Sequence, residues 1–385
     1  MIFAKGAYVE VKEKRCLNLI HHGVECSHCI GHCPSNAIIF DKDHLYLQKD
    51  KCSGCGLCFS DCPTEVFSSK QWDETTIAKD IGEEEWKITE FFCDRHTSPY
   101  KADKSRDRGA VQIPACLSSV SKGAWYEIGL KTEVEIHLDQ CKECPMSETI
   151  ARLEYNLSVA AEWLTACGQD ASFSYIQQGC QGKQKKNLLA IETGLKVTSR
   201  RDLFVSLFNK GQQIAGKASG GKTTFPEEVD STMRNSCLPN WQRRLAEEFE
   251  KNKKDSSDSA YWPSIKIDSD RCVNCGMCSR FCPSGTLQIT VKDGFCNHHF
   301  TSGLCLDCRT CQLFCPREAI SRDREKVERP FETVSIYDTL TGSCRNCEST
   351  TAHHARTLCY WCEEATASDH ELKNSFRKLL LGMSS

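Results

Sequence analysis

Residues 271–283 read RCVNCGMCSRFCP, and residues 304–316 read LCLDCRTCQLFCP. Both segments have the spacing C-x2-C-x2-C-x3-C-P. Three thiols this close in sequence lie on one tight loop and can bind three corners of an iron–sulfur cube. The fourth cysteine, which precedes proline, reaches the neighbouring cube. A disulfide or zinc framework is the alternative, and the doubled spacing with two Cys-Pro pairs disfavours it.

This spacing predicts two [4Fe–4S] clusters that exchange their fourth ligands. We number the predicted cysteine sites in chain order, and these two are sites 4 and 5. Site 4 consists of Cys272, Cys275, Cys278 and Cys315. Site 5 consists of Cys282, Cys305, Cys308 and Cys311.

The N-terminal segment repeats the pattern with one change. The run from Cys52 to Pro63 is complete, whereas the run from Cys26 to Pro34 has Gly23 where the first cysteine is expected. Cys16 is the nearest spare thiol. Site 1 is therefore predicted to be Cys16, Cys26, Cys29 and Cys62, and site 2 to be Cys33, Cys52, Cys55 and Cys58. For site 1, loss of the cluster, a three-iron cluster, or His21 or His22 as fourth ligand stay open as alternatives.

With these motifs, residues 16–70 and 270–325 resemble the bacterial two-cluster 2[4Fe–4S] ferredoxins. The resemblance implies a ferredoxin-like α+β fold around each pair of clusters and one-electron transfer at low potential. Between the motifs, Ala37–Phe40 and His44–Leu47 flank a polar turn and predict a hairpin. Thr286–Val291 and the segment from Phe295 predict a second hairpin on the same plan.

The middle of the chain has a different pattern. After a helical connector at residues 70–85, three strand-like runs each precede a cysteine. A crossover at Ser118–Leu130, a helix at Met146–Ala166 and a further strand at Ser172–Gln177 complete a small α/β domain with a mostly parallel sheet. The three runs are Trp86–Phe92, Ala110–Ile113 and Glu133–Leu138.

Ligands of such sheets gather beyond the carboxyl ends of the strands. The cysteines that follow these strands should meet there, so we predict a fifth cluster site, site 3. Site 3 consists of Cys93, Cys116, Cys141 and Cys144. Buried structural cysteines are the alternative, and Cys180 is a spare candidate ligand.

Residues 86–168 resemble the delta iron–sulfur subunit family of hydrogenases associated with heterodisulfide reductase. The resemblance is carried by the widely spaced single cysteines and by Cys141-x2-Cys144. It implies that site 3 holds an electron-transferring [2Fe–2S] or [4Fe–4S] cluster.

Residues 181–265 are expected to be helical and linker-like. Gly216–Thr223 matches a P-loop pattern, but a helix precedes it where a strand is required, so a Gly/Ser-rich linker is preferred. Ser199–Phe204 resembles a twin-arginine signal, and capping of the next helix by Ser199 is the simpler interpretation. Pro239–Lys254 predicts a helix with one apolar stripe for core or interdomain packing.

The last four cysteines of the chain lie in two CxxC knuckles. Four thiolates at this spacing are typical of a zinc ribbon with a closed structural site. A single iron, as in rubredoxin, is the alternative. The ribbon site consists of Cys344, Cys347, Cys359 and Cys362. A short helix is expected at Glu371–Leu381, and packing is the default role of the unassigned Cys167, Cys237 and Cys296.

Composition agrees with a metal protein. The chain has 385 residues and 28 cysteines, and its formal charge of −3 argues against nucleic-acid binding. Thiolate clusters need a reducing compartment, and no secretory signal or membrane span is recognisable, so a cytoplasmic location is expected. The predicted domains are a first ferredoxin domain at 1–70, an α/β domain at 86–180, a linker region at 181–265, a second ferredoxin domain at 266–330 and a zinc ribbon with a helix at 340–385.

These features predict a multicluster electron carrier. No GxGxxG motif, nucleophile triad or open metal site with a general base is recognisable, so any substrate chemistry is expected on a partner. The expected partners are redox proteins. Two alternatives remain: the electron-transfer subunit of a larger hydrogenase, formate dehydrogenase or molybdenum enzyme, and an iron–sulfur redox sensor.

Overall fold

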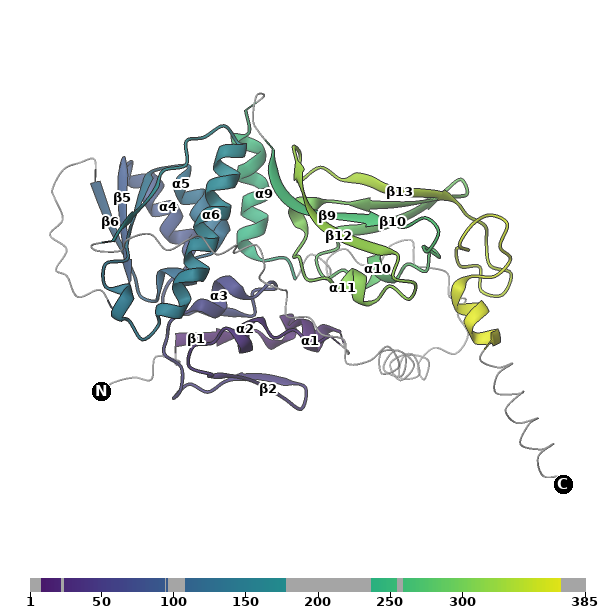
Figure 1. Cartoon of the computed structure of the whole chain (residues 1–385), viewed down its shortest axis with the longest axis horizontal. Helices are drawn as coiled ribbons and strands as arrows, with labels where there is room; N and C mark the ends of the chain where they lie inside the picture. The colour runs from purple at the N-terminus through teal and green to yellow at the C-terminus, as the bar shows by residue number, and fades with distance from the viewer. Residues whose placement is uncertain are drawn as a thin grey trace, which may run out of the picture.

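The computed structural model describes residues 8–21, 24–93, 95, 108–177, 237–254 and 259–367. Helices and strands are mixed along this part of the chain. Figure 1 shows an N-terminal group of short elements beneath a sheet covered by helices, with a second group of strands beside them. No helix in these ranges is both long enough and apolar enough to cross a membrane.

The N-terminal group is held by two antiparallel strand pairs. β1 (Val9–Val11) pairs with β4 (Phe67–Ser69), and β2 (Ile38–Asp41) pairs with β3 (His44–Leu47). The second pair confirms the first predicted hairpin. Three short helices carry or flank the cysteines, and they are α1 (Leu17–Ile20), α2 (His28–Gly31) and α3 (Leu57–Asp61).

The second group, from residue 260, repeats this plan at larger size. β9 (Ala260–Ile267) pairs with β12 (Ile320–Val327), and β10 (Leu287–Lys292) pairs with β11 (Phe295–Phe300), so the second hairpin is also confirmed. A third strand that the sequence analysis missed, β13 (Val334–Leu340), joins β11. Strands therefore extend past both ends of the interval 266–330. The short helices here are α10 (Met277–Arg280) and α11 (Thr310–Leu313).

The three complete cysteine loops share a backbone pattern. Residues at two equivalent places in each loop have positive φ, which L residues adopt at a cost and glycine adopts freely. Glycine occupies three of the six places, and Asn274, Asp307 and Arg309 occupy the others. The pairs are Gly54 and Gly56, Asn274 and Gly276, and Asp307 and Arg309.

The α/β part has a four-stranded sheet in the order β6-β5-β7-β8 with every pairing parallel. This confirms the parallel sheet predicted for the middle region. Helices cover it, and Asp73 and Ser121 cap α4 and α5 by accepting hydrogen bonds from Thr76 N–H and Ala124 N–H. The strands are β5 (Ile88–Cys93), β6 (Arg108–Ile113), β7 (Glu133–His137) and β8 (Phe173–Ile176). The helices are α4 (Glu74–Glu84), α5 (Lys122–Gly129) and α6 (Ile150–Ala166).

Helix α9 (Asn240–Asn252) lies between the α/β part and the second group of strands (Figure 1). Leu245 and Phe249 are buried in the same apolar core as the α/β sheet. Gln242 Nε2 donates to the carbonyl of Gly303, at 2.7 Å, in the second group. Phe249 of the predicted apolar stripe also lies edge-on to Trp262 of β9, 5.7 Å between ring centroids, so the stripe packs between domains.

After β13, Ser343 and Thr350 form an isolated β-bridge, and a helix begins at Tyr360. Several predictions lie outside the described residues: the P-loop-like and twin-arginine-like segments, Cys180, and the helix at 371–381.

Candidate metal centres

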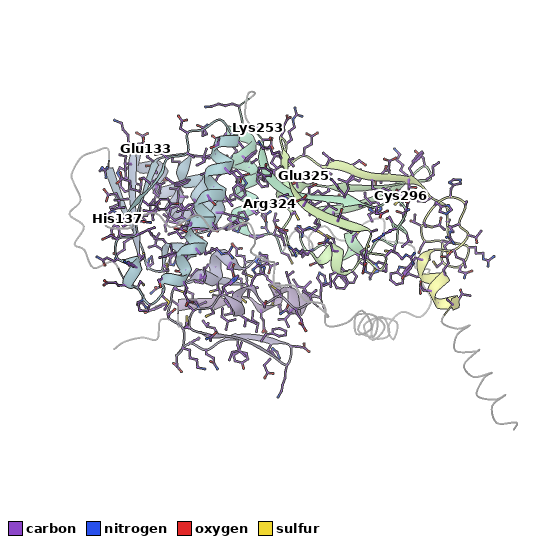
Figure 2. The ribbon with its side chains drawn as sticks, in the orientation of Figure 1. Glu133, His137, Lys253, Cys296, Arg324 and Glu325 are labelled. Carbon is purple, nitrogen blue, oxygen red and sulfur yellow. The ribbon has the colours of Figure 1, made fainter. Side chains whose placement is uncertain are left out.

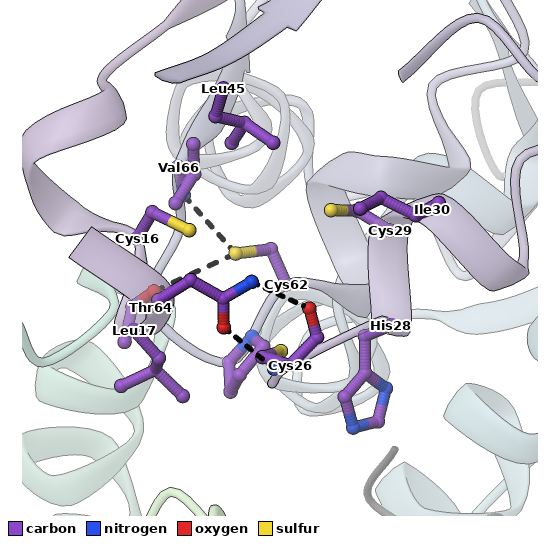
Figure 3. A pocket seen from close by; sticks show the side chains of 12 residues that line it. Cys16, Leu17, Cys26, His28, Cys29, Ile30, Leu45, Cys62, Thr64 and Val66 are labelled. Atoms are coloured by element: carbon purple, nitrogen blue, oxygen red, sulfur yellow. Dashed lines mark hydrogen bonds between the residues drawn. The ribbon is translucent and has the colours of Figure 1, made fainter. Parts of the chain in front are cut away.

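The four cysteines of site 1 come together although Cys16 and Cys62 are far apart in sequence. Cys16 precedes α1, Cys26 and Cys29 lie around the start of α2, and Cys62 follows α3. All four line one pocket with the apolar side chains of Leu17, Leu45 and Val66. Figure 3 shows the sulfur atoms of Cys16, Cys29 and Cys62 directed at a common space. His21 instead lies edge-on to Phe281, 5.2 Å between ring centroids.

Electrostatics at site 1 favour a bound cationic centre. Burial, together with repulsion from the neighbouring Cys62 and Cys16, raises the pKa of the Cys26 thiol to about 12. The same causes raise the pKa of Cys29. Iron binds thiolates rather than thiols, so its positive charge would offset both penalties. The donor set therefore fits an iron–sulfur cluster.

Site 2 is assembled in the same way. Its four cysteines line a second pocket. Burial raises the pKa of Cys58 well above its usual range, and Cys55, Cys29, Cys52 and Cys33 contribute repulsion. Because Cys29 belongs to site 1, the two sites are close neighbours.

Sites 4 and 5 repeat this arrangement. Burial raises the pKa of Cys278, and repulsion comes from the other three members of site 4 and from Cys311 of site 5. In site 5, burial raises the pKa of Cys311 to about 12, with contributions from Cys308 and Cys282. Burial also raises the pKa of Cys305, where Cys308 adds repulsion.

Three of the four predicted cluster ligands that precede proline accept hydrogen bonds from the backbone. Ala37 N–H donates to Cys33 Sγ at 3.3 Å, and Val66 N–H donates to Cys62 Sγ at 3.4 Å. Ala319 N–H donates to Cys315 Sγ at 3.2 Å. Each donor lies four residues after its cysteine. Such N–H···S bonds would tune the potential of a bound cluster.

The four cysteines of site 3 converge at the carboxyl ends of the parallel strands. Cys93 ends β5, and Cys141 follows β7 closely. Burial raises the pKa of Cys141 to about 12, and Cys116, Cys93 and Cys144 add repulsion in that order. The backbone N–H of Cys116 donates to the carbonyl of Cys55 at 3.0 Å, so site 3 adjoins site 2.

The ribbon site is tighter than the others. Its four Sγ atoms lie within 4.8 Å of one another, and Cys347 Sγ is 3.5 Å from Cys359 Sγ and 3.6 Å from Cys362 Sγ. Tetrahedral coordination with metal–sulfur bonds of about 2.3 Å separates the ligands by roughly 3.8 Å. Among the described residues, no other cysteine quartet closes to this degree. The geometry fits one metal ion.

A polar network lies between sites 1 and 2 and was not predicted from the sequence. Asp61, whose side chain is 1% exposed, accepts a 2.8 Å hydrogen bond from His32 Nδ1 and forms an ion pair with Arg152 of α6. Burial alone would raise the pKa of Asp61, but hydrogen bonds from His28 and His32 and the charge of Arg152 lower it below its usual range. The His28-x3-His32 spacing around Cys29 is the feature of the sequence that could have indicated this network. The Asp61 carboxylate already forms an ion pair with Arg152. His28, His32 and Asp61 are therefore better described as part of an ion-pair network than as a metal site.

The unassigned cysteines that the structure describes are all buried. Cys167 is fully enclosed and lies 3.2 Å from Tyr126 Oη, in agreement with a packing role. Cys296 is buried in β11.

Two of these cysteine-rich segments match a known family. The family model described as the 4Fe-4S binding domain matches residues 45–68 and 265–288. Residues of the chain are 42% identical over 45 positions to a probable iron–sulfur protein of the Frd operon of Proteus vulgaris, covering 12% of this chain and 29% of that protein. They are 35% identical over 48 positions to the PorD component of pyruvate synthase from Methanothermobacter marburgensis, covering 12% of this chain and 56% of that protein.

The chain matches less than two thirds of the length of either relative. The residues that the family model matches lie outside 86–168, so the resemblance of that region to the hydrogenase delta family stays a prediction. The matched segments contain Cys52–Cys62 and Cys272–Cys282. The chain therefore contains two 4Fe–4S binding domains, at residues 45–68 and 265–288.

Proposed function

We propose that this protein is a multicluster electron carrier that relays single electrons at low potential between redox partners. In this proposal, sites 1, 2, 4 and 5 each hold a [4Fe–4S] cluster. Site 3 holds a further [2Fe–2S] or [4Fe–4S] cluster, in keeping with the resemblance to the hydrogenase delta family. The ribbon site holds a structural zinc ion.

The observation that carries the proposal is the continuity between the sites. Site 3 adjoins site 2 through the hydrogen bond between Cys116 and Cys55. Cys29 of site 1 lies in α2, and Cys33 of site 2 follows the same helix closely. Sites 1 and 2 are therefore adjacent. No site is therefore isolated from the next along this half of the molecule.

An apolar junction connects site 1 to sites 4 and 5. Cys26, Cys275 and Cys308, one from each site, pack against the same buried cluster of side chains. Within the junction, the rings of Phe281 and Phe314 stack with centroids 3.9 Å apart and planes 6° apart. The buried members of this cluster are Leu17, Val24, Met277 and Phe314.

Bound iron–sulfur clusters would supply reversible one-electron transfer with little change in geometry. The residues of this chain would hold the clusters at fixed separations, exclude water through the apolar junction, and tune potentials through the N–H···S hydrogen bonds. None of these roles requires a catalytic side chain. Substrate chemistry would belong to a partner.

One finding favours the alternative that the chain serves as an electron-transfer subunit of a larger oxidoreductase. Both similar proteins are named as subunits, one from the Frd operon and one of pyruvate synthase. Copurification with a large catalytic chain would decide for this alternative. A redox sensor would instead lose clusters in oxygen and change its binding to a partner.

The test is anaerobic purification, with iron, sulfide and zinc quantified, and EPR spectroscopy of the reduced protein. The proposal predicts about sixteen irons from four cubes, two to four more from site 3, and about one zinc. Cys16→Ser should remove about four irons or give a three-iron signal. The matched control is Cys296→Ala, which changes a buried cysteine near site 4 that is outside every quartet. Full iron content and unchanged EPR signals in Cys16→Ser would refute the ligand set of site 1.

A further inference from the structure

Arg322 of β12 is a buried cation beside site 5. Its side chain is only 5% exposed. Ile320, two residues earlier on the strand, packs in the same apolar cluster as Cys305 and Cys311 of site 5. Because alternate residues of a strand share a face, Arg322 is directed to the same side as Ile320. Figure 2 labels Arg324, two residues further along this strand.

The guanidinium group of Arg322 is only partly satisfied by the chain. Its Nη2 donates to the carboxylate of Asp307, which lies in the loop between Cys305 and Cys308. Its Nε and Nη1 are buried and have no hydrogen-bond partner among the described residues. Buried donors without an acceptor are costly, so these two groups indicate that an acceptor belongs here. The sulfur atoms of a bound iron–sulfur cluster accept hydrogen bonds.

The combined effect of Arg322 and Asp307 on site 5 is that of a positive charge. The Asp307 side chain is 44% exposed, so water and salt screen its charge more than that of Arg322. Burial raises the pKa of Cys305, and Arg322 opposes this increase more strongly than Asp307 adds to it. Burial also raises the pKa of Cys308 and Cys311, and Arg322 again acts in the opposite direction. Negative charge at site 5 is therefore stabilised by Arg322.

The first cluster-binding part has no cation at the corresponding position. Arg322 lies seven residues after Cys315, and Ser69 lies seven residues after Cys62. Both residues belong to the strand that follows the last cysteine loop of their part, β12 and β4. Ser69 is uncharged, and its hydroxyl oxygen accepts a 3.1 Å hydrogen bond from the N–H of Gln71. Site 5 and its counterpart, site 2, therefore differ in charge at this position.

We propose that Arg322 raises the reduction potential of the cluster bound at site 5. Reduction adds one negative charge to the cluster, and a buried cation stabilises the more negative state. Hydrogen bonds from the free N–H groups to sulfur would act in the same direction. Electrons in the relay would then be drawn toward site 5. The inference rests on the proposed [4Fe–4S] cluster at site 5.

The test is a redox titration of the anaerobically purified, cluster-loaded protein with dithionite, followed by EPR spectroscopy. The site 5 signal is the one that Cys308→Ser alters. Arg322→Gln should make site 5 about tenfold harder to reduce, which is a shift of about 59 mV to lower potential for one electron. Arg322→Lys retains the positive charge, so its site 5 should stay within about twofold of the wild type.

Arg309→Gln is the matched control. Arg309 lies in the loop of site 5 but is exposed, so the variant makes the same charge change without burial. Its effect on site 5 should be smaller than about twofold and should disappear in about 1 M salt, since salt screens exposed charges. The shift in Arg322→Gln should persist at the same salt concentration, because buried charges are screened much less.

An unchanged site 5 potential in Arg322→Gln, with the cluster retained, would overturn the proposal and leave the electron relay intact. Equal shifts in Arg322→Gln and Arg309→Gln would also overturn it, since burial would then have no effect. If Arg322→Gln loses the site 5 cluster, Arg322→Lys decides. A retained cluster at nearly the wild-type potential supports the role of the charge, and a lost cluster refutes it. If no EPR signal responds to Cys308→Ser, the cluster assignment itself fails, and the inference fails with it.

Discussion

The backbone N–H of Cys116 donates a 3.0 Å hydrogen bond to the carbonyl oxygen of Cys55. One residue belongs to the α/β domain and the other to a complete cysteine loop of the first cluster-binding part. A second bond, from Ser60 Oγ to the carbonyl of Ser118 at 2.6 Å, reinforces the same junction. The separation of sites 2 and 3 is therefore set by direct backbone contact rather than by a linker.

Gly56 should be the most sensitive glycine at this junction. Its φ is +74°, and an added Cβ would lie 2.7 Å from the Cβ of Ser119. Gly56→Ala should reduce the free energy of unfolding by about 1–2 kcal/mol from backbone strain alone, with the contact adding to the loss. Anaerobic denaturation of the loaded protein measures this. Gly31→Ala is the control, since nothing lies within 4 Å of its added Cβ, and an equal loss in both variants would contradict the argument.

The ion pair between Arg152 and Asp61 should stabilise the interface between α6 and α3. Arg152→Met would leave the buried Asp61 carboxylate without its cation, at an expected cost of about 3 kcal/mol in the free energy of unfolding. The double variant Arg152→Met with Asp61→Asn should recover part of the loss, because no buried charge remains. Arg329→Met removes an exposed pair with Glu332 and should cost less than about 1 kcal/mol. Similar losses for Arg152→Met and Arg329→Met would show that burial has no effect here.

Local signals predicted much of this structure. Cysteine spacing located the three-cysteine loops, and strand-like runs located β5, β7 and both hairpins, because these patterns depend on residues close in sequence. The parallel sheet followed from strands that alternate with helices. The convergence of site 3 was expected from the carboxyl ends of those strands. Cys116, Cys93 and Cys144 are near enough to Cys141 to raise its pKa, and a cluster at this site stays a prediction.

Features that join distant segments were not predictable in this way. The network around Asp61 needs Arg152 from another domain, 91 residues away. Lys122, Trp241 and Arg324 line one pocket, and they come together only after the domains pack. Strand β13 was a local miss, since its β-branched residues in VSIYDTL are typical of a strand.

His298 should make stability depend on pH. Burial lowers the pKa of His298 to about 4, with a smaller contribution from His299. The unfolded chain binds this proton near pH 6.5 and the folded protein does not, so stability is lost as pH falls below 6.5. At pH 5.5 the loss should be about 1.4 kcal/mol relative to pH 7.5. Denaturation of His298→Gln at both values should show a smaller pH dependence, whereas His44→Gln, at an exposed hairpin residue, should match the wild type.

The ribbon site should protect site 4 from oxidation. Asn274 Nδ2, in the loop of site 4, donates to the carbonyl of Ala352 in the ribbon at 3.0 Å, and Trp361 packs against the apolar junction beside Cys275. Cys344→Ser or chelation should release the structural ion, loosen this cover and expose site 4 to oxygen. The expected result is faster bleaching of visible absorbance in air, with EPR signals of site 4 lost before those of site 2. Arg345→Gln, at an exposed residue of the same knuckle, is the control. If Cys344→Ser loses its ion and yet bleaches at the wild-type rate, the ribbon does not cover the cluster.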